Sequence, residues 1–91
     1  MANDFKELVQ FIKSSQDSLR SFLPMLEEET GRLIKEGVQD SPAIERHLDT
    51  LLSLTSAGLA DDLFIRLLEY YKTIDPAAAR DYWDIYEEQN E

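Results

Sequence analysis

Apolar residues recur in steps of three and four along most of the chain, the spacing that lines one face of an α-helix. The first such stripe extends from Phe5 to Leu33 and covers about four heptad-like repeats. Because Ser15 and Glu29 are polar, it predicts a packing face for neighbouring helices and not a regular coiled coil. The stripe consists of Phe5, Leu8, Ile12, Ser15, Leu19, Phe22, Leu26, Glu29 and Leu33.

Pro24 lies within this first stretch. A proline inside a helix removes a backbone hydrogen bond and costs about 3 kcal/mol unless the helix kinks. The stripe stays in phase across Pro24, which favours a kinked continuation. However, an unbroken helix over 4–36 would be roughly 50 Å long, whereas a domain of this length has a radius of gyration of roughly 12 Å. We therefore expect a bend or break near Pro24, with helices over 4–21 and 23–36, and Ser21 is a candidate N-cap for the second.

Three further helices are predicted over 42–57, 59–73 and 76–88. Gly37 ends the preceding segment, and Ser41-Pro42 has the order of an N-cap followed by a proline at the first helical position. Gly58 is expected to close the next helix, and Asp75-Pro76 repeats the cap-then-proline order.

No segment alternates between apolar and polar residues with a period of two, as strands do. The expected fold is therefore all-α. Because the connections between the helices are short, successive helices should pack as antiparallel neighbours. We expect residues 1–91 to form one domain, a small up-and-down bundle of four to five helices.

The chain is acidic, with 19 acidic and nine basic residues and a formal charge of -10. This charge disfavours direct binding to nucleic acid or to an anionic membrane, because like charges repel. Solubility is its simplest explanation, and a basic protein partner is also compatible with it. The sequence begins without a basic signal-peptide start and has no long apolar run, so we expect a cytoplasmic protein without a membrane span.

The residues needed for enzyme chemistry or metal binding are scarce. His47 is the only histidine and there is no cysteine. The Glu-x-x-His spacing of bundle di-iron sites fails, because the residue three before His47 is Ile44. Consecutive acids at 27–29 fan around a helix and cannot share one ion, and the glycines are isolated. We predict no catalytic residues, no metal and no cofactor.

Aromatic residues gather near the C-terminus. Tyr70 and Tyr71 end the fourth expected helix, and Tyr82, Trp83 and Tyr86 lie on the fifth. An antiparallel hairpin at Asp75-Pro76 would bring the two groups together. Neighbours in sequence cannot both point inward, so we expect Tyr71 and Tyr82 in the core and some aromatic surface at the rim.

This aromatic surface coincides with a concentration of negative charge. Residues 75–91 contain six acidic residues and one basic residue, Arg80. Exposed tyrosine and tryptophan often anchor protein interfaces, so this region is the candidate site for a basic protein partner. A solvated C-terminal helix would explain the same pattern. The candidate partner-binding residues are Tyr70, Trp83, Asp84, Tyr86 and Glu87.

The pattern favours a non-enzymatic protein-interaction module, such as an adaptor, inhibitor or regulatory subunit. A second hypothesis is a structural homodimer in which the Phe5–Leu33 stripe pairs between two chains. A third is a nucleic-acid mimic, which would need carboxylates spaced like phosphates on one exposed face.

Overall fold

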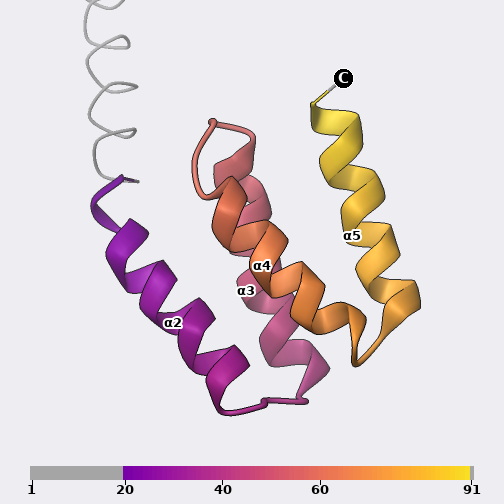
Figure 1. Ribbon diagram of the computed structural model, residues 1–91. Coiled ribbons are helices and arrows are strands. Elements are labelled where there is room, and N and C mark those ends of the chain that lie inside the picture. Colours follow the sequence, from indigo (N-terminus) through magenta and orange to yellow (C-terminus); the bar gives the residue numbers. More distant parts are fainter. Residues whose placement is uncertain (1–19, 91) are drawn as a thin grey trace, which may run out of the picture.

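A computed structural model describes residues 20–90, which form four helices and no strand. These are α2 (Leu23–Lys35), α3 (Ser41–Thr55), α4 (Asp61–Lys72) and α5 (Pro76–Gln89). Successive helices run in opposite directions (Figure 1). The expected all-α, up-and-down bundle is therefore confirmed. The helix expected over 4–21 lies outside the described residues, apart from helical residues 20 and 21.

The break near Pro24 is also confirmed. A turn at Phe22 separates helical residues 20 and 21 from α2, and Phe22 is the N-cap of α2. The first backbone bond of α2 runs from Leu26 N–H to Phe22 O at 3.0 Å. Pro24 therefore lies in the first turn, where the missing N–H would have no partner inside the helix. Phe22, and not Ser21, is the capping residue.

Glycines end α2 and α3 as expected. Gly37 and Gly58 both have positive φ, at 64° and 78°, which glycine adopts without strain. In the first of these turns, Val38 N–H bonds to Leu33 O and Gly37 N–H to Ile34 O, both at 3.1 Å. These two bonds form a Schellman motif that satisfies the last carbonyls of α2.

Two expected helix starts are wrong by one or two residues. Ile44 N–H bonds to Asp40 O, so Asp40 is the N-cap of α3 and Ser41 is its first residue. The fourth helix begins at Asp61 and not at 59, because Ala60 has a φ of 64° in the left-handed region and cannot continue a right-handed helix. By contrast, Asp75 caps α5 as expected and accepts a bond from Ala78 N–H at 3.1 Å.

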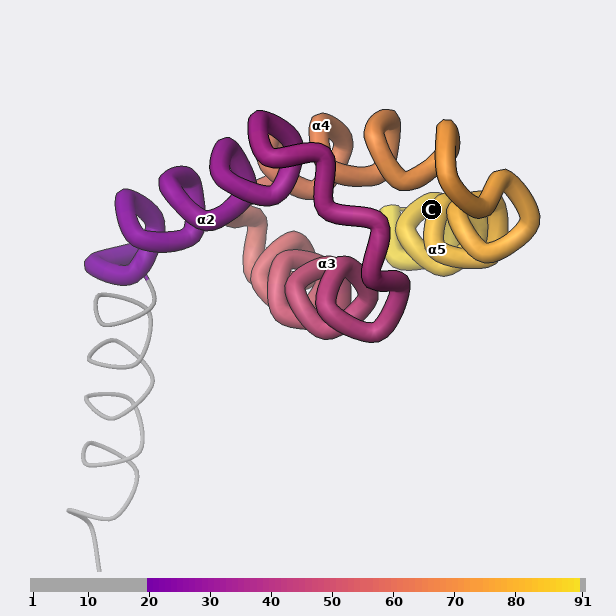
Figure 2. Tube along the Cα trace, turned by 90° about the horizontal axis from the view of Figure 1, so that it is seen from below, coloured from indigo at the N-terminus to yellow at the C-terminus, as the bar shows by residue number. Residues whose placement is uncertain are grey.

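The helix at the centre of the bundle is α4, which contacts each of the other three. Figure 2 shows α2 and α4 in one row, with α3 and α5 on the same side of it. The apolar core lies between these helices, and α4 contributes the largest share of it. Its buried members are Leu33, Ile44, Leu48, Leu51, Phe64, Leu67, Leu68, Tyr71 and Ala79.

Tyrosine hydroxyls join the helices by donating hydrogen bonds to carboxylates on neighbouring helices. Tyr71 of α4 donates to Glu45 of α3, and Tyr82 of α5 donates to Asp49 of α3 at 2.8 Å. Tyr71 is fully buried and Tyr82 partly buried, which agrees with their expected place in the core. Burial raises the pKa of both phenols, and the carboxylate each one faces raises it further.

His47 joins α3 to α2 in a similar way. Its Nε2 lies 2.8 Å from Oγ1 of the buried Thr30. Thr30 gives its own hydroxyl proton to Leu26 O at 2.8 Å, so His47 Nε2–H must be the donor to Thr30 Oγ1. Burial lowers the pKa of His47, and the nearby Glu29 carboxylate opposes part of this effect.

Protonation of His47 should therefore destabilise the bundle. The pKa of His47 is below its unfolded value of 6.5, so the unfolded chain binds the proton more readily. The contribution of neutral His47 to the free energy of unfolding is therefore fully present above pH 6.5, and it is lost as the pH falls toward the pKa of His47 in the folded protein. We expect the free energy of unfolding, measured by urea denaturation at about pH 7.5 and about pH 5, to fall more in wild type than in His47→Gln. An equal or smaller fall in wild type would contradict this role.

Candidate functional site

A groove runs along the outer side of α4 and α5 and has a volume of about 580 Å³. Its residues come from one face of each helix, because they recur at steps of three and four. Helix α4 contributes Ile65, Leu68, Glu69 and Lys72, and α5 contributes Pro76, Ala79, Arg80, Trp83, Asp84 and Glu87. Two antiparallel helices thus form the walls of a furrow with an apolar floor.

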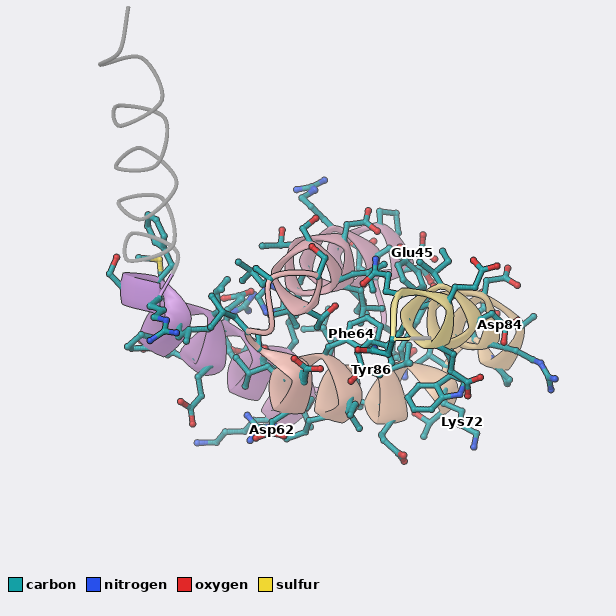
Figure 3. All side chains as sticks on the ribbon, turned by 90° about the horizontal axis from the view of Figure 1, so that it is seen from above. Glu45, Asp62, Phe64, Lys72, Asp84 and Tyr86 are labelled. Atoms are coloured by element: carbon teal, nitrogen blue, oxygen red, sulfur yellow. The ribbon has the colours of Figure 1, made fainter. Side chains whose placement is uncertain are left out.

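Trp83 is the largest side chain in this groove and is 38% exposed. Its ring packs against Tyr86, with ring centroids 5.4 Å apart. Tyr86 in turn packs on the buried Phe64 of α4 at 5.1 Å. Figure 3 shows Phe64 and Tyr86 lying between α4 and α5, whereas Asp84 and Lys72 lie toward the outside. The indole is therefore supported on one side by the ring of Tyr86, which itself packs on the buried Phe64.

The Tyr86 hydroxyl fixes this stack to the start of α4. It donates a hydrogen bond to Asp61 Oδ2 at 2.7 Å. That bond to a carboxylate, together with burial, raises the pKa of Tyr86. The phenol therefore stays protonated at neutral pH and remains a donor.

The charged residues of the groove are separated along its length. Lys72 and Arg80, together with the acidic Glu69, lie toward the turn that joins α4 to α5, and Asp84 and Glu87 lie toward the far end of α5. Within residues 20–90 the ion pairs are those of Arg32 with Glu29 and Glu36. The groove charges therefore have no ion-pair partner in this part of the chain.

The structure brings three of the five sequence-predicted site residues together. Trp83, Asp84 and Glu87 line the groove. Tyr86 lies behind Trp83, and the Tyr70 hydroxyl points to the α2–α3 connection, where it donates to Val38 O at 2.7 Å. Both tyrosines thus make structural contacts outside the groove.

Sequence reasoning missed the α4 side of the groove and the basic residues Lys72 and Arg80. A signal for them was present. Ile65, Leu68 and Lys72 have the same three- and four-residue spacing as Pro76, Ala79, Arg80 and Trp83. Two such stripes joined by a short turn face each other in an antiparallel hairpin.

Two further properties concern residues 20–90. No set of three or more histidine, aspartate and glutamate side chains in this part of the chain is arranged to hold a metal ion. None of its helices has the length and apolarity needed to cross a membrane.

Fold and groove together describe a small all-α bundle with a charged, tryptophan-centred furrow on its last two helices. No family model, no curated protein and no solved structure matches the chain.

Proposed function

We propose that this protein is a non-enzymatic protein-interaction module and that the α4–α5 groove is its binding site. The observation that carries the proposal is Trp83, a large aromatic side chain that is partly exposed in a groove and held by the Tyr86–Phe64 stack. Tryptophans held in this way often supply most of the binding free energy of an interface, because little conformational entropy is lost when they are covered. Adaptors, inhibitors and regulatory subunits all act through such surfaces.

The charges of the groove support the same proposal. Lys72, Arg80, Asp84 and Glu87 surround an apolar floor that includes Leu68 and Ala79. An apolar centre with a polar rim is the usual composition of a specific protein interface. Because these charges have no ion-pair partner within residues 20–90, a bound protein can pair with them.

Trp83→Ala should weaken binding of the physiological partner by at least about 2 kcal/mol, or about 30-fold in Kd. The partner is first recovered by affinity capture from the native cell with wild-type protein, and its Kd is then measured by calorimetry. Ile85→Ala is the matched control, because Ile85 is an exposed apolar residue of α5 outside the groove. Equal binding by wild type and Trp83→Ala would refute this placement of the site.

A structural homodimer is the second candidate. One observation favours it: Phe22, in the Phe5–Leu33 stripe, is 49% exposed and nearby Met25 is 62% exposed. Farther along the stripe, Leu33 is buried inside the bundle and so is not free to pair with a second chain. Light scattering separates the two candidates, since a strict monomer at micromolar concentration eliminates the dimer.

A further inference from the structure

The α4–α5 groove has opposite charges at its two ends, and this indicates what kind of segment it binds. We propose that its ligand is an amphipathic helix of a partner protein, acidic at one end, basic at the other and apolar along one stripe. This inference rests on the proposed function, because it names the partner chemistry of the same groove.

The dimensions of the groove suit a helix. On α5 it extends from Pro76 to Glu87, which corresponds to about 17 Å, or about three helical turns. The groove-lining residues of α4 and α5 lie side by side and form a furrow between them. Amphipathic helices usually bind in a groove of this kind. Apolar side chains on such a helix, spaced by three and four residues, would meet Ile65, Leu68 and Trp83.

The charges determine how such a helix would align. Lys72 and Arg80 form the end beside the α4–α5 turn, where Glu69 offsets part of their charge. Asp84 and Glu87 form the other end, which carries no basic residue. A ligand with acidic residues over the first end and basic residues over the second would pair with both. A uniformly charged ligand would be repelled at one end.

The C-terminus of α5 also favours basic ligand residues at the end of the groove formed by Asp84 and Glu87. Glu87 and Glu88 lie in the last turn of α5, and no basic residue is present there. Negative charge at the C-terminus of a helix is unfavourable, because the helix dipole is negative at that end. Lysine or arginine from a partner would relieve this repulsion as well as pair with Asp84 and Glu87.

Three designed helical peptides of about 14 residues test the inference. They share the same leucine stripe and carry either glutamates at one end and lysines at the other, lysines throughout, or glutamates throughout. Binding to the full-length protein is followed by NMR of the backbone amides and of the indole N–H of Trp83, the chain's only tryptophan. We expect the mixed-charge peptide to bind roughly tenfold more tightly than the other two at about 0.15 M salt, where the charge of the rest of the protein is largely screened.

Charge reversal supplies the decisive comparison. Asp84→Lys with Glu87→Lys should make the all-glutamate peptide the tightest ligand, and Lys72→Glu with Arg80→Glu should favour the all-lysine peptide. Asp81→Lys with Glu88→Lys is the matched control for the first pair, because it makes the same charge change on α5 outside the groove. The control should keep the wild-type order of affinities.

The outcomes separate this inference from the proposed function. The same peptide order in wild type and both groove reversals would overturn the charge assignment. Failure of all three peptides to shift the Trp83 indole signal at millimolar concentration would overturn the helical ligand. In either case the capture experiment with Trp83→Ala still decides independently whether the groove binds a protein.

Discussion

Phe64→Ala should lower the free energy of unfolding by about 4 kcal/mol. Phe64 is fully buried on α4, the helix that packs most extensively against the others, and its ring packs on Tyr86 at 5.1 Å. Removing the ring deletes apolar contacts and leaves a cavity that the surrounding helices cannot fully close. Urea denaturation followed by far-UV circular dichroism measures the change.

A bundle of this size has a total stability of roughly 5–15 kcal/mol, so the loss expected in the alanine variant is a large fraction of the whole. Phe64→Leu keeps the comparison measurable, because it retains most of the apolar volume and should cost roughly 1.5 kcal/mol. Ile85→Ala, on the exposed side of α5, should stay within about 0.5 kcal/mol of wild type. A Phe64→Ala cost below about 1 kcal/mol would show that the α4–α5 contact does not hold the bundle together.

The fold was predictable because its helices are marked by local chemistry. Within a helix, a proline such as Pro24 or Pro76 is tolerated only in the first turn or at a kink, and Gly37 and Gly58 take the positive φ that ends a helix. These constraints depend on each residue and its immediate neighbours. They were therefore readable without knowledge of the tertiary structure.

The helix starts that were misplaced depend on backbone conformation that side-chain type does not determine. Ala60 takes a left-handed φ although alanine rarely does, so its residue type does not predict this conformation. Asp40 caps α3 through its carbonyl, without a side-chain hydrogen bond to the helix. Because aspartate and serine are both common N-cap residues, residue type alone does not show that Asp40 and not Ser41 is the cap.

The arrangement of the helices was harder to predict than their existence. The long Phe5–Leu33 stripe predicts a packing face for neighbouring helices, whereas among the described residues α4 is the helix that packs most extensively against the others. A stripe reports which face of a helix is apolar. It does not report how many neighbours that face meets.

The candidate site was predictable only in part, for the same reason. Trp83, Asp84 and Glu87 were recognised because an aromatic residue and acids stood close together in sequence. In the net charge of residues 75–91, Arg80 only offsets one of the six acidic residues. In the folded chain Arg80 instead lies with Lys72 at one end of the groove. Its position in the groove therefore says more about the site than its contribution to the net charge of residues 75–91.

Substitutions at Tyr86 test whether this residue contacts the partner directly or only supports Trp83, which does. Tyr86→Ala should lower the free energy of unfolding by about 3 kcal/mol, because it removes the ring between Phe64 and Trp83 and the hydroxyl bound to Asp61. It should also weaken partner binding, since Trp83 loses its support. Urea denaturation and calorimetry measure the two effects.

Tyr86→Phe separates support from contact, because it keeps the ring and removes only the hydroxyl. Loss of the hydrogen bond to Asp61 should cost about 1 kcal/mol of stability. Tyr70→Phe, which loses its bond to Val38 O, is a matched control of similar cost. Because the ring still packs against Trp83, we expect Tyr86→Phe to bind the partner within about twofold of wild type. If Tyr86→Phe instead lost as much affinity as Trp83→Ala, the Tyr86 hydroxyl would belong to the interface, and the binding surface would extend from the groove toward the start of α4.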